Sequence, residues 1–120
     1  MTRYVVLRKG NNMKVSEILK LSLKQINDVD LSNEIEGVYI GDLLSFVMAN
    51  GKTGALWLTV QKHLNVIAVA DLNDFAGIIF VQNSYPDQDT IAKATELKIP
   101  LFISEDDAYH VAKEVVNLGL

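Results

Sequence analysis

The sequence predicts an α/β domain with a mostly parallel β-sheet flanked by helices. Three observations support this fold class. Short runs of bulky and β-branched residues alternate with segments of helical period, turn residues separate the two kinds of segment, and 120 residues suit a single domain. Strands that alternate with helices are typical of a parallel sheet, because parallel neighbours need a crossover connection.

The N-terminal quarter of the chain contains two predicted strands and one predicted helix. Residues 4–7 form a short apolar run that ends at the turn-prone segment 10–12. Apolar residues then recur at helical spacing over 15–23, with Ser16 available as the N-cap. Residues 25–29 are the second predicted strand.

The middle of the chain is predicted to contain two strands joined by a helix. The strands are 37–40 and 55–60, and the helix is 43–48. Asp42 suits the N-cap of this helix, since its carboxylate can accept the free amide hydrogens of the first turn. Residues 50–51, Asn-Gly, are expected to end the helix in a left-handed conformation.

The segment 63–74 is ambiguous between helix and strand. Its core, 66–70, is rich in valine and isoleucine and would suit a buried strand. The same segment connects the strand 55–60 to the clear strand 77–81, and two parallel strands need a crossover of about a dozen residues. We therefore predict a helix.

The last third of the chain is predicted to form helix, strand and helix. The first helix covers 87–98, with Pro86 at its first position. The strand is 99–103. The final helix, 108–118, follows segment 104–107, in which a serine precedes an acid by three residues as in a capping box.

Charge and composition narrow the classes of function. Residues 1–24 carry six basic side chains and one acidic one, a net +5, and the other 96 residues carry five basic and fourteen acidic ones, a net −9. The basic residues are scattered and the rest of the chain repels phosphate, so nucleic acid is disfavoured as a partner. Basic residues of this kind are typical of a solvent-exposed face. The alternative is a face that docks against an acidic surface on a partner or on a second copy of the chain.

Cysteine and long apolar runs are both missing from the sequence. The lack of cysteine excludes disulfides, thiol nucleophiles and iron–sulfur clusters. No apolar run reaches the roughly 18–20 residues that cross a bilayer, and the N-terminus lacks the apolar core of a signal peptide. We expect a cytoplasmic protein that does not bind membranes.

The motifs of common catalytic sites are absent. Segment 51–53, Gly-Lys-Thr, resembles the end of a phosphate-binding loop, but Phe46 occupies the position of the required first glycine. No Gly-x-Gly-x-x-Gly pattern is present, and His63 and His110 lack the spacing of paired metal ligands. No cofactor, metal or catalytic residue is predicted.

The candidate binding residues follow the carboxyl ends of the predicted strands, where ligands bind in open α/β sheets. They are uncharged hydrogen-bonding groups, one carboxylate and one imidazole, and they suit a small polar or phosphorylated ligand. The full set is Gly41, Asp42, Ser45, Thr59, Gln61, His63, Asn65, Gln82, Asn83, Ser84 and Ser104. The alternative is that the acid and the serines cap helices, while the threonine and asparagine satisfy turn backbones.

The order of several segments resembles the DRTGG domain family. The matching segments are 13–19, 36–45, 55–65, 76–81 and 99–104. The resemblance implies a three-layer α/β domain over 13–120, similar to the N-terminal domain of bacterial HPr kinase/phosphorylase, with 1–12 as an N-terminal extension or edge strand. The Asp-Arg-Thr-Gly-Gly string that names the family is not present, and Lys52-Thr53-Gly54 is at most a fragment of it.

Members of the DRTGG family act as accessory or ligand-sensing modules, some beside CBS pairs and some in hydrogenase-associated or signalling gene contexts. The resemblance therefore implies a non-catalytic regulatory module, a homodimer that binds a small polar or nucleotide-like ligand and acts through a partner protein.

Two alternative functions remain open. One is a ligand-free adaptor that uses an exposed apolar patch such as Tyr4, Val6 or Trp57. The other is an enzyme in which His63 is the general base and Asp42 orients it.

Overall fold

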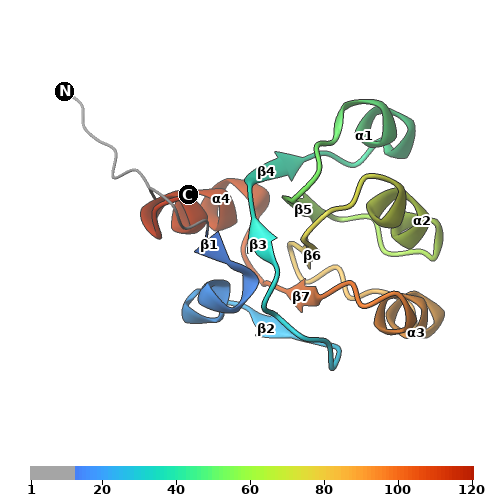
Figure 1. The fold of residues 1–120 in the computed structure, drawn as a ribbon, viewed down its shortest axis with the longest axis horizontal. Helices are drawn as coiled ribbons and strands as arrows, with labels where there is room; N and C mark the ends of the chain where they lie inside the picture. Colours follow the sequence, from blue (N-terminus) through green and yellow to red (C-terminus); the bar gives the residue numbers. More distant parts are fainter. Residues whose placement is uncertain (1–12) are drawn as a thin grey trace.

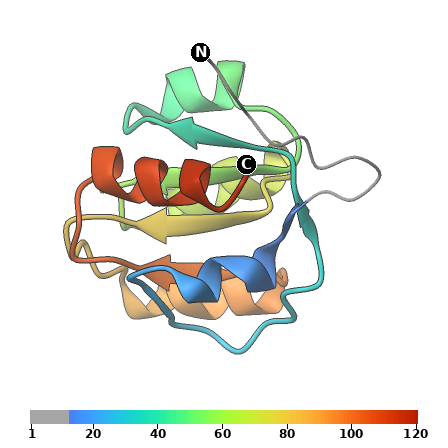
Figure 2. The ribbon, with the colours of Figure 1, turned by 90° about the vertical axis from the view of Figure 1, so that its left-hand side faces the viewer.

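The computed structural model describes residues 13–120, so the strand predicted at residues 4–7 lies outside the described part. A central sheet with helices on both of its faces forms the described part (Figures 1 and 2). The elements in chain order are β1 (Met13–Lys14), the 3-10 helix η1 (Val15–Lys20), β2 (Lys24–Gln25), β3 (Glu34–Ile35), β4 (Gly37–Ile40), α1 (Leu44–Asn50), β5 (Ala55–Thr59), α2 (Asn65–Leu72), β6 (Gly77–Phe80), α3 (Gln88–Glu96), β7 (Leu101–Ile103) and α4 (Ala108–Asn117).

The central sheet is mostly parallel, as predicted. Its five strands lie in the order β2-β7-β6-β5-β4, and β4 to β7 run parallel to one another. β2 is antiparallel to β7, with Lys24 opposite Ile103. A separate two-stranded antiparallel ladder joins β1 to β3. The sheet therefore places the carboxyl ends of β4 to β7 along one edge, where β2 begins.

Helices cover both faces of the sheet and make three layers. α1, α2 and α3 lie on one face, and α4 and η1 lie on the other (Figure 1). The first face is packed by Val47 of α1, Ile67 of α2 and Ala94 of α3. The second is packed by Ile18 of η1 and Val111 of α4. β5, an interior strand of the sheet between β6 and β4, is buried at every residue, as expected for a strand covered on both faces.

The ambiguous segment 63–74 forms a helix, α2, which confirms the crossover argument. α2 connects the parallel neighbours β5 and β6, and buries Val66, Ile67, Val69 and Ala70 against the sheet. The strand alternative failed because topology, and not β propensity, decides the conformation of a segment between two adjacent parallel strands.

The helix predicted at 15–23 is wrong in type and length. The structure has the 3-10 helix η1 there, and its N-cap position is Lys14 and not Ser16. η1 buries Val15 and Ile18, which stand three residues apart, and three residues per turn is the period of a 3-10 helix. The strand predicted at 25–29 is also shorter and forms β2.

Two predicted features around α1 are corrected by the structure. Leu43, and not Asp42, occupies the N-cap position, and no side chain caps this helix. Gly51 ends α1 with a φ of −66°, so the predicted left-handed stop is wrong. Glycine is needed there for space, because a Cβ at Gly51 would lie 2.4 Å from the Phe75 ring and 2.5 Å from the Asn73 amide.

The starts of the last two helices also differ from prediction. Asp87 is the N-cap residue of α3, so Pro86 lies one residue before the cap instead of inside the helix. Asp107, and not Ser104, caps α4, and its carboxylate accepts a hydrogen bond from the backbone N–H of His110. No helix within residues 13–120 is long and apolar enough to cross a membrane.

Candidate functional site

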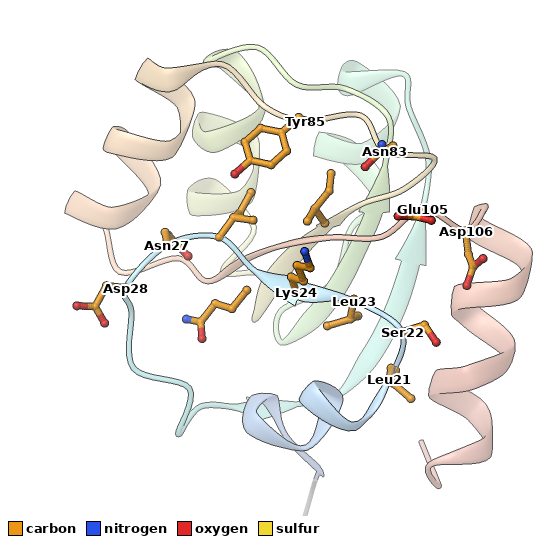
Figure 3. Close-up of a pocket in the computed structure, with 13 residues that line it drawn as sticks. Leu21, Ser22, Leu23, Lys24, Asn27, Asp28, Asn83, Tyr85, Glu105 and Asp106 are labelled. Atoms are coloured by element: carbon orange, nitrogen blue, oxygen red, sulfur yellow. The ribbon is translucent and has the colours of Figure 1, made fainter.

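A groove lies beside the edge strand β2, at the carboxyl ends of β6 and β7 (Figure 3). Its volume is about 1030 Å³. Figure 3 shows Tyr85 and Asn83 on one side, Leu21 and Ser22 on the opposite side, and Lys24 of β2 between them. The lining residues are Leu21, Ser22, Leu23, Lys24, Gln25, Ile26, Asn27, Asp28, Asn83, Tyr85, Ile103, Glu105 and Asp106.

A buried asparagine fixes the β2 wall of the groove. Lys24 and Gln25 pair with β7, and the Ile26 N–H donates to the Leu101 carbonyl oxygen at 2.9 Å. The Asn27 side chain then extends this pairing by one residue. Its Nδ2 donates to the Ile99 carbonyl oxygen at 2.9 Å, and its Oδ1 accepts from the Leu101 N–H at 2.9 Å. One amide side chain therefore holds the segment that follows β2 against the start of β7.

Two residues with left-handed backbone conformation fix the opposite wall. Gln82 and Asn83 have φ values of 54° and 58°, which asparagine tolerates better than most residues. Their N–H groups donate to the carbonyl oxygens of Asp106 and Ser104, each at 2.8 Å. The loop after β6 thus supports the loop after β7 from both sides of Glu105.

Ser104 contributes to the scaffold of the groove. Its hydroxyl accepts from the Asp106 N–H at 3.1 Å and donates to the Ser22 carbonyl oxygen at 3.2 Å. The side chain is buried, with 2% of the residue exposed. Ser104 therefore joins the loop after β7 to the segment before β2 and does not line the groove.

The groove surface combines apolar, hydrogen-bonding and charged groups. Ile26 and Ile103 are its apolar residues on the α3 face, and Tyr85 is 52% exposed at its rim. Lys24 is the one basic side chain among the residues that line the groove. Three carboxylates line it as well, those of Asp28, Glu105 and Asp106.

The predicted site residues Asp42, Thr59 and Gln61 are brought together by the structure, but they bind one another. Asp42 Oδ1 accepts from Thr59 Oγ1 at 2.7 Å and from the Val60 N–H at 2.9 Å. Gln61 Nε2 donates to the Asp42 carbonyl oxygen at 2.7 Å. These bonds tie the turn after β4 to the turn after β5, so the three polar side chains act in the scaffold.

His63 is paired with a residue that the sequence analysis did not select. Its Nδ1 lies 2.6 Å from Asp87 Oδ2 at the start of α3, and both side chains are partly exposed. The Asp87 N–H also donates to the Lys62 carbonyl oxygen. Within residues 13–120 no hydrogen bond joins His63 to Asp42, which the enzyme alternative required.

A second histidine–aspartate pair lies at the start of α4. The carboxylate of Asp107 accepts from the backbone N–H of His110 at 2.9 Å and lies 2.7 Å from its ring Nδ1. The backbone hydrogen bond, followed by the bond from the His110 ring, lowers the pKa of Asp107 below its usual value. The ionised form of Asp107 is therefore the form that caps the helix.

The remaining predicted residues lie apart from the groove or at its margin. The carbonyl oxygen of Gly41 accepts from Trp57 Nε1 at 2.9 Å. Ser45 and Asn65 are exposed near the starts of α1 and α2. Ser84 is half-buried, and its N–H donates to the Val81 carbonyl oxygen. Of the eleven predicted residues, Asn83 alone is among those lining the groove.

The sequence analysis missed Lys24, Asn27, Tyr85 and Glu105. Tyr85 and Glu105 lie in the same loops after β6 and β7 as the predicted Asn83 and Ser104. The rule that ligands bind beyond the carboxyl ends of the strands could therefore have selected them. Lys24 and Asn27 belong to the β2 segment, whose antiparallel place beside β7 no local pattern indicates. Within the described part of the chain, no three histidine or acidic residues are grouped so that they could hold a metal ion.

No protein-family model matches the chain, and no curated protein matches it in sequence. Among solved structures, it is similar to the CBS and DRTGG domains of the regulatory region of Clostridium perfringens pyrophosphatase, crystallised in complex with the activator diadenosine tetraphosphate. The TM-score is 0.61 at 11% sequence identity. The match covers 82% of this chain and 44% of the other, so this chain corresponds to less than half of that regulatory region. The likeness shows a CBS/DRTGG-like fold.

Proposed function

We propose that the protein is a non-catalytic regulatory module that binds a small nucleotide-like ligand in the groove beside β2 and acts through a partner protein. The groove itself is the observation that carries the proposal. It lies where open α/β sheets bind ligands, beyond the carboxyl ends of parallel strands. Its volume is at the upper end of the range for small-molecule sites.

Three features of the groove support a nucleotide-like ligand. Tyr85 offers an exposed aromatic ring, Ile26 and Ile103 offer apolar contact, and Asn83 offers an amide that can both donate and accept. Any of the nucleobases can stack on an aromatic ring, because each has a π-face. The fold is also shared with a regulatory region that was crystallised with a dinucleotide activator.

The proposal is tested by calorimetric titration with AMP, ATP and diadenosine tetraphosphate. We expect at least one of them to bind, and at 100 times its Kd to stabilise the fold by about 2.7 kcal/mol. Tyr85→Ala is expected to weaken binding by about tenfold, since loss of stacking on a base costs roughly 1–3 kcal/mol.

Tyr109→Ala is the matched control, because Tyr109 is 70% exposed on α4 and does not line the groove. We expect this variant to bind like the wild type. Absence of binding across the panel, or equal losses in the two tyrosine variants, would contradict the proposal.

A second candidate function is a ligand-free adaptor, and the surface of α1 favours it. The prediction that Trp57 contributes to an exposed adaptor surface is wrong, because Trp57 is fully buried in the interior strand β5. Large apolar side chains are exposed instead at Leu43 (67%) and Phe46 (61%). α1 carries no charged residue, so this surface can face its own copy without like-charge repulsion, and we assign a second copy as its occupant.

Sedimentation velocity tests the second candidate. If the α1 surface self-associates, the wild type sediments as a dimer and Phe46→Glu as a monomer. Val116→Glu is the control, because Val116 is equally exposed (61%) on α4, which covers the opposite face of the sheet. A wild type that stays monomeric at high concentration would remove this candidate.

A further inference from the structure

The charge of the groove limits which part of a nucleotide can occupy it. Three carboxylates and one ammonium line the groove, which gives the lining a net charge of −2 at neutral pH. Phosphate sites are ordinarily built from arginine, lysine or helix N-termini, and Lys24 is the sole such group on the lining. A phosphate chain inside this groove would meet net repulsion.

We infer that the groove binds the nucleoside part of the ligand, the base and the ribose, and that the phosphates remain outside it. The inference rests on the proposed function and specifies its ligand chemistry. A neutral base and ribose carry no charge for the carboxylates to repel. They also have the apolar faces and the hydroxyl donors that this lining can contact.

Tyr85 is the residue that we assign to the base. Its ring is half-exposed at the rim, in the loop that leads into α3, and Figure 3 shows it on the same side of the groove as Asn83. A base lying on this ring would cover the apolar side chains of Ile26 and Ile103, which line the same groove. Stacking and apolar burial would then supply affinity without any phosphate contact.

Glu105 is the residue that we assign to the ribose. A carboxylate accepts hydrogen bonds from ribose hydroxyls, as an acidic residue does in dinucleotide-binding sheets. The backbone on both sides of Glu105 is fixed, since the carbonyl oxygens of Ser104 and Asp106 accept from the N–H groups of Asn83 and Gln82. The Asp106 N–H is bound to the Ser104 hydroxyl as well. Glu105 therefore projects from a supported loop.

Calorimetric titration of the full chain with adenosine, AMP and 2′,3′-dideoxyadenosine tests the assignment. Adenosine is expected to bind at least as tightly as AMP, because the phosphate gains nothing in an acidic groove. Dideoxyadenosine is expected to bind about tenfold more weakly than adenosine, since it lacks the 2′- and 3′-hydroxyls that would donate hydrogen bonds to the Glu105 carboxylate.

A chemical double-mutant cycle identifies the carboxylate involved. Glu105→Gln is expected to weaken adenosine binding by about tenfold and to leave dideoxyadenosine binding unchanged. Glu96→Gln is the matched control, because Glu96 is an exposed acid on α3 that does not line the groove. Its Oε2 lies 3.2 Å from Lys93 Nζ. This variant should change neither affinity.

The outcomes separate this inference from the proposed function. If AMP or diadenosine tetraphosphate binds and adenosine binds more than tenfold more weakly, the phosphates occupy the groove and the inference is wrong, while the proposed function stands. If Glu105→Gln weakens adenosine and dideoxyadenosine equally, the ribose assignment is wrong. If no nucleoside or nucleotide binds at all, the proposed function and the inference fail together.

Discussion

Trp57→Ala is expected to lower the free energy of unfolding by about 3–5 kcal/mol, the range for loss of a large aromatic side chain from a core. Trp57 lies on the interior strand β5 and is fully buried. Its ring packs against Phe75, with ring centroids 5.4 Å apart and a tilt of 58°. Natural domains are stable by about 5–15 kcal/mol in total, so this one change would remove a large share of the stability.

The same tryptophan also joins the core to the carboxyl edge of the sheet. Its Nε1 donates to the carbonyl oxygen of Gly41, the residue before Asp42, at 2.9 Å. Trp57→Phe keeps most of the apolar contact and removes this hydrogen bond. We expect the phenylalanine variant to lose clearly less stability than the alanine variant.

Urea unfolding followed by far-UV circular dichroism measures both variants. Trp57 is the sole tryptophan of the chain, so intrinsic tryptophan fluorescence cannot report on either of them. A loss below about 1 kcal/mol for Trp57→Ala would mean that β5 is not packed on both faces as the structure has it.

The parallel strands and their crossovers could be predicted from the sequence because their signals are local. Strands covered on both faces need continuous apolar runs, and β5, β6 and β7 are buried at every residue. The helix α2 could be predicted as well, since two adjacent parallel strands require a crossover connection whatever the β propensity of the segment between them.

Helix caps and edge elements were predicted less well, because several partners competed for the same polar groups. Asp42 has the right residue type for an N-cap, but its carboxylate binds Thr59 and Val60 on the neighbouring turn. Asp87 occupies an N-cap position and yet its carboxylate pairs with His63. These choices depend on which loops lie side by side, which sequence spacing does not show.

The location of the candidate site could be predicted, but most of its lining residues could not. The rule that ligands bind beyond the carboxyl ends of parallel strands led to Asn83 and to the loop after Ser104. The other half of the groove comes from the segment that contains Lys24 and Asn27, more than fifty residues before Asn83 in the sequence. It reaches β7 as an antiparallel strand of two residues, too short for a period-two pattern to reveal.

Asn27→Ala is the change expected to affect the fold and the site together. The Asn27 side chain is buried, and it satisfies the Ile99 carbonyl oxygen and the Leu101 N–H at 2.9 Å each. Alanine would leave both backbone groups without this partner, and a buried group left unsatisfied costs about 1–3 kcal/mol. We expect a loss of about 2–4 kcal/mol in the free energy of unfolding, measured by urea titration.

The Asn27 variant also tests whether β2 is a wall of the binding site. If it is, Asn27→Ala should weaken nucleoside binding at a temperature where the fold persists, because the end of the β2 segment, with Asp28 on the groove lining, would lose its side-chain bonds to the start of β7. Asn65→Ala, at an exposed position at the start of α2, should change stability by less than about 0.5 kcal/mol and leave binding intact. If Asn27→Ala lowered stability but kept full affinity, the ligand would have to bind outside this groove. The polar turns that follow β4 and β5 would then be the next place to search.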